Sequence, residues 1–116
     1  MTKVRNTAAL AAFSLLVAGI SFLMPVSKTL AKDAAPTFDA KCVMCHGKNG
    51  SGDTPMGKNM KVPDLRSKTV QGKSDAALND IIDKGKGIMP AYGSQLSKEE
   101  IGDLVAYIRH LAGNAK

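Results

Sequence analysis

The chain has 116 residues, a formal net charge of +6 and 4% aromatic residues. This length is enough for one small domain. The charge forms no basic block and is not interleaved with aromatic residues, so we expect no nucleic-acid partner.

Residues 1–31 have the pattern of a secretory signal peptide. Lys3 and Arg5 form a basic start, residues 8–24 form a long apolar run, and Pro25 follows that run. This segment contains three of the basic residues and none of the acidic ones, so the rest of the chain has a net charge of only +3.

Thr29-Leu30-Ala31 offers the small residues that a signal peptidase inspects, so we expect cleavage after Ala31. The domain is then residues 32–116, and we expect it in the periplasm or otherwise outside the cytoplasm. An uncleaved membrane anchor is the alternative, because the apolar run approaches the roughly 18–20 residues that span a bilayer.

A first short helix is predicted over residues 36–45. Pro36 suits the first turn, and Phe38, Cys42 and Cys45 follow at helical spacing. Positions three apart lie on one face of a helix, so both cysteine side chains can reach one edge of a planar ligand.

The run Cys42-Val43-Met44-Cys45-His46 contains both cysteines of the chain. C-x-x-C-H is the attachment signature of c-type haem. The two thiols add across the vinyl groups of the porphyrin, and the adjacent histidine becomes an axial iron ligand. We therefore predict one covalent haem c attached to Cys42 and Cys45, with His46 binding its iron.

Other uses of the two cysteines are a redox pair, a zinc site or a simple disulfide. A thioredoxin-like pair needs a βαβ context, and only His46 and His110 remain to complete a zinc site. An oxidising compartment permits a Cys42–Cys45 disulfide. We favour haem because the full motif, including its histidine, occurs in a short exported chain.

The segment after the motif is predicted to be irregular. Residues 47–57 contain four glycines and Pro55, which favours a long loop. Another loop segment begins at residues 62–65, where Leu65 is a candidate to touch the haem ring.

Two longer helices follow, and no stretch alternates like a strand. One is predicted from the N-cap Ser74 to just before Gly85. The other begins with a capping box formed by Ser97 and Glu100 and ends near Gly113. We predict an all-α fold with three main helices and loops wrapped around the haem.

Met89 is the predicted second iron ligand, in a loop over residues 85–93. A thioether is a soft, neutral ligand, and a His/Met pair raises the reduction potential of haem iron. Pro90 would stiffen the loop. Met56 and Met60 are competing ligands, and Met89 as a core residue is the simplest alternative. His110 is predicted to point away from the apolar face of the last helix.

The small size of the domain makes the cofactor part of the predicted core. A domain of roughly 85 residues has difficulty burying enough apolar surface unaided. We therefore expect the chain to be poorly folded without haem.

These motifs resemble the class I c-type cytochromes, in particular small bacterial monohaem electron carriers. The resemblance covers essentially all of residues 32–116 and rests on residues 42–46, 87–92 and 103–108. It implies the cytochrome c fold, with the first and last helices crossing near the haem.

The resemblance also implies roles for individual residues. Phe38 would pack against Leu104 and Tyr107 of the last helix. The carbonyl of Pro55 would accept the proton on the second ring nitrogen of His46, which would orient the ring. Tyr92 would contact the haem, either near a propionate or as ordinary packing.

The expected function is one-electron transfer between redox proteins, not catalysis. His46 and Met89 would keep the iron six-coordinate, and we expect a monomer. Six lysines flank the haem-binding segments and could steer docking to an acidic partner: Lys41, Lys48, Lys58, Lys61, Lys84 and Lys86. The alternatives are a haem enzyme or small-gas sensor with an open sixth iron position, and a fixed cytochrome subunit of a larger redox complex.

Overall fold

The computed structural model describes residues 33–114, so the predicted signal peptide lies outside the described residues. The helices of this part are α2 (Ala35–Lys41), α3 (Val43–His46), α4 (Pro55–Met60), α5 (Lys68–Gln71), α6 (Asp75–Lys84) and α7 (Lys98–Gly113). Within these residues the only strand-like pairing is an isolated bridge between Lys86 and Met89. The predicted all-α fold is confirmed. None of the described helices is long and apolar enough to cross a membrane.

The first predicted helix is divided at Cys42 into α2 and α3. Cys42 has φ −115° and ψ −32°, which departs from ideal helical geometry. Its amide still donates to the Phe38 carbonyl at 2.8 Å, and its own carbonyl accepts from the His46 amide at 2.9 Å. The bend therefore occurs at the first cysteine of the motif while the helical hydrogen bonding continues.

The prediction of an irregular loop over residues 47–57 is wrong in its last part. Pro55 occupies the first turn of α4, and the Thr54 side chain accepts a hydrogen bond from the Gly57 amide as the N-cap. A second short helix, α5, begins after a Ser67 cap that accepts from the Val70 amide. A cap and a proline at the first turn are local helix signals that the high glycine content hid.

The two longer helices begin and end as predicted. The Ser74 side chain accepts from the Ala77 amide at the start of α6, and Gly85 follows its last residue with φ 74°. Ser97 and Glu100 form the predicted capping box of α7. Each helix end is therefore satisfied by residues that local sequence identifies.

The core forms where α2 crosses α7. Phe38 and Leu104 are each 1% exposed and belong to one buried cluster. The rings of Phe38 and Tyr107 are 4.9 Å apart, so the packing implied by the family resemblance is confirmed. His110 is exposed, as predicted, and lies within hydrogen-bonding distance of Asn114.

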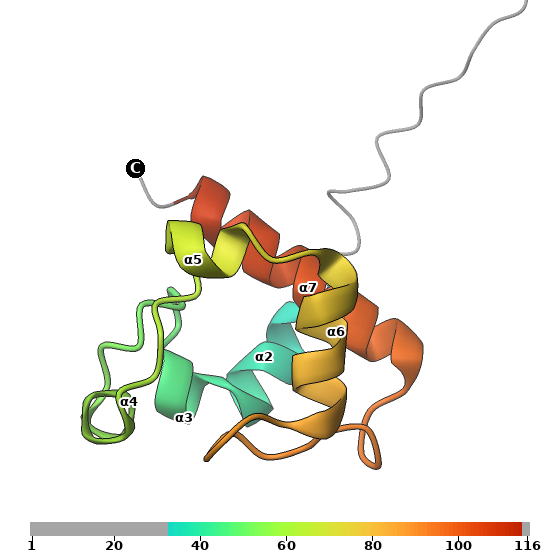
Figure 1. The fold of residues 1–116 in the computed structure, drawn as a ribbon, viewed down its shortest axis with the longest axis horizontal. Coiled ribbons are helices and arrows are strands. Elements are labelled where there is room, and N and C mark those ends of the chain that lie inside the picture. Colours follow the sequence, from blue (N-terminus) through green and yellow to red (C-terminus); the bar gives the residue numbers. More distant parts are fainter. Residues whose placement is uncertain (1–32, 115–116) are drawn as a thin grey trace, which may run out of the picture.

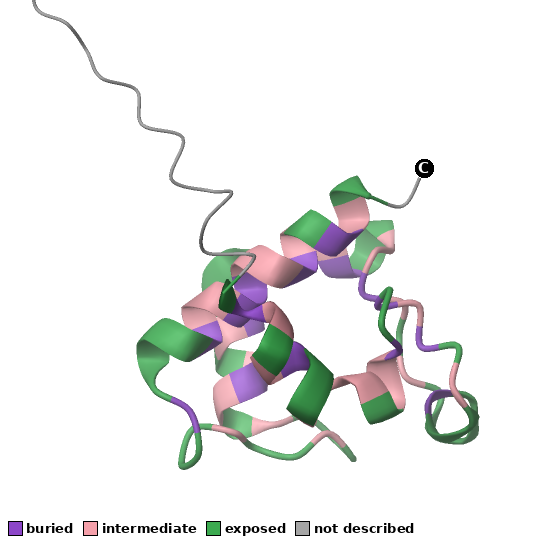
Figure 2. Ribbon diagram, turned by 180° about the vertical axis from the view of Figure 1, so that it is seen from behind, coloured by how far each residue is buried: buried purple, intermediate pink, exposed green. Residues whose placement is uncertain are grey.

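The helices surround a cavity that is lined by side chains of α2, α6 and α7. In Figure 1, α5, the turn that leads to α6 and α7 lie along the upper side, and α3 lies on the opposite side. Buried residues gather where α2, α6 and α7 meet, whereas α4 is mostly exposed (Figure 2). This arrangement places α2, α6 and α7 at the wall of the cavity.

Candidate haem-binding site

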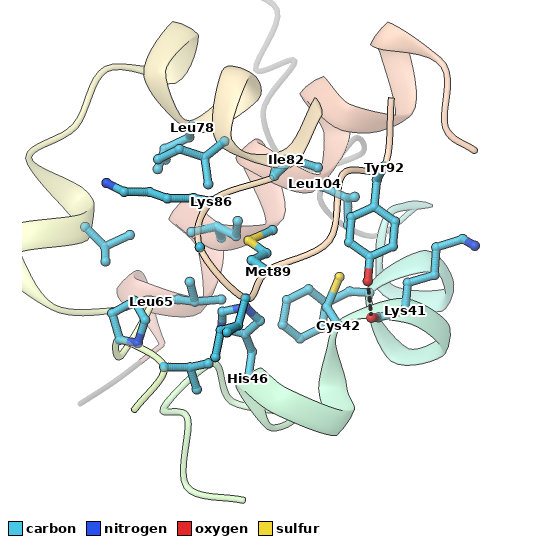
Figure 3. Close-up of a pocket in the computed structure, with 18 of the residues that line it drawn as sticks. Lys41, Cys42, His46, Leu65, Leu78, Ile82, Lys86, Met89, Tyr92 and Leu104 are labelled. Atoms are coloured by element: carbon cyan, nitrogen blue, oxygen red, sulfur yellow. Dashed lines mark hydrogen bonds between the residues drawn. The ribbon is translucent and has the colours of Figure 1, made fainter. Parts of the chain in front are cut away.

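A cavity of about 360 Å³ lies between the helices. Its walls are largely apolar and come from all parts of the domain: Phe38 of α2, Leu65 and Val70 around α5, Leu78 and Ile82 of α6, and Leu104 of α7. Figure 3 shows side chains from these elements converging on this space. A concave apolar site with few polar groups is what a large planar cofactor requires.

The two cysteines lie at one side of this space. Cys42 lines the main cavity, and both Cys42 and Cys45 line a smaller adjoining cavity of about 50 Å³. Both are free thiols, so the structure contains no Cys42–Cys45 disulfide. Burial raises the pKa of the Cys42 thiol to about 11. Redox-active C-x-x-C pairs have a lowered thiol pKa instead, so the raised pKa of Cys42 does not favour a thioredoxin-like pair.

The His46 side chain lines both cavities. Burial lowers the pKa of His46, which favours the neutral imidazole that binds metals. Its Nδ1 atom is buried and has no hydrogen-bond partner among the described residues. A neutral imidazole in the wall of this cavity fits a site where one ring nitrogen binds iron.

The predicted hydrogen bond from His46 to the Pro55 carbonyl is not formed in this structure, because His46 Nδ1 has no partner. The Thr54 hydroxyl lies 2.9 Å from the Met44 carbonyl and 3.1 Å from the Cys45 carbonyl, at the end of α3. These contacts hold the start of α4 against the backbone carbonyls of the C-x-x-C-H motif. Pro55, the next residue, is exposed. Pro55 lines neither cavity.

The loop that carries Met89 is held by backbone hydrogen bonds. The amide of Lys86 donates to the Met89 carbonyl at 3.1 Å, and the amide of Met89 donates back to Lys86 at 3.0 Å. The Tyr92 amide donates to the Ile82 carbonyl at 2.9 Å, which ties the far end of the loop to α6. A Cβ on Gly85 would lie 2.5 Å from the Met89 carbonyl oxygen, so this close turn requires glycine.

Met89 and Met60 both line the two cavities, and Met89 is packed against the core cluster. Met56 lines neither cavity, and Met44 is 72% exposed. The structure therefore keeps Met60 as a competing thioether while it places Met56 away from the cavities.

Leu65 and Tyr92, the two predicted haem contacts, both line the cavity. Leu65 is 8% exposed. The Tyr92 hydroxyl donates to the Lys41 carbonyl at 3.2 Å, immediately before the first cysteine (Figure 3). This hydroxyl lies at the cysteine side of the cavity, which favours packing over contact with a propionate.

Several lining residues were not singled out from the sequence. Val62 and Pro63 line the cavity from the segment between α4 and α5, and Lys73 lines it from the turn before α6. No local pattern marks these positions. The only signal for Val62 and Pro63 was their place in the loop segment predicted to begin at residues 62–65.

Comparison with known proteins identifies the fold family. Residues 29–108 match the family model described as cytochrome c oxidase, cbb3-type, subunit III. A cbb3-type cytochrome c oxidase subunit FixP from Azorhizobium caulinodans is 33% identical over 98 residues, which are 84% of this chain and 32% of that protein. The chain thus spans about a third of the length of this relative.

Cytochrome c6 proteins match over most of their own length. Cytochrome c6 from Picosynechococcus sp. is 29% identical over 110 residues, which are 90% of this chain and 93% of that protein. Cytochrome c6 from Bryopsis maxima is 32% identical over 74 residues, 64% of this chain and 83% of that protein. Because the family match covers more than half of the chain, the chain belongs to this family of c-type cytochrome domains, whose cofactor is covalently bound haem c.

Proposed function

We propose that the chain is a one-electron carrier that works outside the cytoplasm after removal of residues 1–31. The observation that carries this proposal is the meeting of Cys42, His46 and Met89 around one apolar cavity in a cytochrome c domain. The haem supplies reversible one-electron chemistry at its iron when it is bound.

The residues of the haem site have distinct roles in this proposal. Cys42 and Cys45 would hold the haem through thioethers, while His46 and Met89 would bind its iron. A protein that fills both axial positions leaves no open site for a substrate. Leu65 and the other apolar walls exclude water, and a lower local dielectric helps to tune the reduction potential.

Docking is proposed to occur at the mouth of the cavity, with a redox protein that has an acidic surface. Two of the six candidate lysines are paired locally: Lys58 with Asp53 at 2.6 Å, and Lys84 with Asp80. Lys41, Lys61 and Lys86 line the cavity instead. The position of Lys41 and Lys61 at the cavity supports a role for their charges in steering a partner toward the haem.

The steering proposal is tested by the salt dependence of electron transfer. Lys41→Gln and Lys61→Gln should each weaken the dependence of the transfer rate on ionic strength, because exposed charges are screened within about 10 Å at 0.1 M salt. Lys58→Gln is the matched control, since its charge is already paired. A wild-type rate that does not change with salt would count against steering.

A second candidate is a fixed cytochrome subunit of a larger redox complex. The family description and the oxidase-subunit relative favour it. Membrane fractionation separates the two candidates. A carrier should be released with the soluble extracytoplasmic fraction, whereas a subunit should co-purify with an oxidase complex in the membrane.

The haem site is tested by optical spectroscopy of protein made with an extracytoplasmic haem-attachment system. The expected result is a covalent low-spin spectrum with the weak far-red ferric band of a Met–iron bond. Met89→Ala should remove that band, and Met60→Ala, which changes the other cavity-lining thioether, should retain it.

The opposite pattern would assign Met60 as the ligand. A high-spin spectrum that readily takes up carbon monoxide would favour a haem enzyme or gas sensor over an electron carrier. Protein without covalent haem would refute the proposed site altogether.

A further inference from the structure

The main cavity combines apolar walls with an unbalanced set of charges. Four lysines line it, and no aspartate or glutamate does: Lys41, Lys61, Lys73 and Lys86. A haem carries two propionate carboxylates, which are costly to place beside apolar walls unless a cation pairs with them. The question is which lysines lie at the propionate edge.

Covalent attachment decides how the porphyrin is oriented. The thioethers form at the vinyl groups, and the propionates are on the opposite edge of the macrocycle. With Cys42 and Cys45 bonded, the propionate edge faces away from the α2–α3 bend. Lys41 is adjacent to Cys42, and its ammonium donates to the Gln95 side chain at 3.2 Å, so it belongs to the thioether edge.

Lys86 extends toward the other side of the cavity. In Figure 3 its ammonium points away from Cys42, Lys41 and Tyr92 and lies on the side of Leu78 and Leu65. Its backbone is held by the paired hydrogen bonds that also hold the Met89 loop. The start of this side chain is therefore fixed while its long stem remains free to reach a carboxylate.

Lys73 approaches from the turn between α5 and α6, which lies across the cavity from α3 (Figure 1). Arg109 of α7 holds this turn: its guanidinium donates to the Lys73 carbonyl at 2.6 Å and to the Gln71 carbonyl at 3.0 Å. Lys73 is half-buried. Among residues 33–114, neither Lys73 nor Lys86 makes a salt bridge.

We propose that Lys73 and Lys86 pair with the two haem propionates and so hold the edge of the cofactor opposite the thioethers. Arg109 acts as a positioning residue for Lys73. This inference rests on the proposed haem attachment at Cys42 and Cys45. It assigns to these two lysines a role different from the steering role of Lys41 and Lys61.

The direct test is proton NMR of the reduced, low-spin holoprotein. The propionate methylene protons should show nuclear Overhauser contacts with the ε-methylene protons of Lys73 and Lys86, and none with those of Lys41. Lys73→Arg and Lys86→Arg should each remove the corresponding cross-peak, which assigns it. Propionate methylenes that contact neither lysine would overturn the proposal.

The second test compares reduction potentials of charge-matched variants. Lys73→Gln and Lys86→Gln should lower the potential, because an unpaired propionate stabilises ferric iron, and the arginine variants should restore it. Lys84→Gln is the control, since this exposed lysine is two residues from Lys86, is paired with Asp80 and does not line the cavity. An equal shift in Lys84→Gln would show a general charge effect and overturn the pairing.

The two levels of the proposal fail differently. A wild-type protein without a covalent low-spin spectrum would refute the haem site and this inference together. An intact spectrum combined with propionates that contact neither lysine would refute the pairing and leave the electron-carrier function in place.

Discussion

Loss of haem attachment should unfold the domain. The change is the double substitution Cys42→Ser and Cys45→Ser, produced without haem. The cavity of about 360 Å³ then has no cofactor to fill it. At about 24 cal/mol per Å³ of cavity, this corresponds to about 9 kcal/mol. A domain of roughly 80 residues has a total stability of about 4–12 kcal/mol, so the cost is comparable to all of it.

Far-UV circular dichroism, urea unfolding and amide NMR measure this effect. The haem-free double variant should show reduced helicity, no cooperative urea transition and poorly dispersed amide signals. Met44→Ser is the matched control, because Met44 lies between the cysteines and is 72% exposed. It should load haem and unfold cooperatively. A haem-free variant that unfolds cooperatively and has dispersed signals would refute the cavity argument.

Three further substitutions test the Met89 loop, the hydrogen bonds of Arg109 to the turn before α6, and the capping box of α7. Gly85→Ala forces a Cβ to within 2.5 Å of the Met89 carbonyl oxygen at φ 74°, so the Met–iron band should weaken, and an unchanged spectrum would contradict this. Arg109→Ala should cost about 1–3 kcal/mol in urea unfolding because two backbone carbonyls lose their donor. Asp75→Asn removes the charge of an exposed carboxylate that pairs with Arg109 and lies in the first turn of α6, and it should cost less than about 1 kcal/mol. Equal losses of stability in the two variants would mean that the ion pair, and not the hydrogen bonds to the carbonyls, stabilises the turn. Hydrogen bonding from the Ser97 backbone lowers the pKa of Glu100, so its contribution is fully present above the ordinary glutamate pKa and is lost as pH falls through the lowered value. The stability difference between wild type and Glu100→Gln should accordingly shrink from pH 7 to pH 3, and a constant difference would contradict the linkage.

Some features could be predicted because they depend on neighbours in the chain. Ser74 caps α6, and Ser97 with Glu100 caps α7, because a cap bonds to amides only two or three residues away. The C-x-x-C-H motif is also local, so the haem followed from five consecutive residues, while the family resemblance also rested on residues 87–92 and 103–108. The packing of Phe38 on Tyr107 came from the family resemblance, since local periodicity does not pair distant helices.

The tertiary structure decided which distant residues share the cavity. Thr54 ties α4 to the carbonyls at the end of α3 and leaves Pro55 exposed, so a loop proline predicted to bond His46 does not reach it here. Met60 and Met89 both line the cavity, and sequence spacing could not separate them.

The lysines show the same contrast between what the sequence determines and what the tertiary structure determines. Lysine content and net charge are properties of the sequence alone, but charge alone does not say where each ammonium lies. Lys73 lines the cavity from a turn whose backbone is bonded to Arg109, in a helix far along the chain. Local hydrogen bonds and periodicity thus determined the helices and the attachment motif, whereas side-chain packing across the fold determined the walls of the haem site and the charges at its edges.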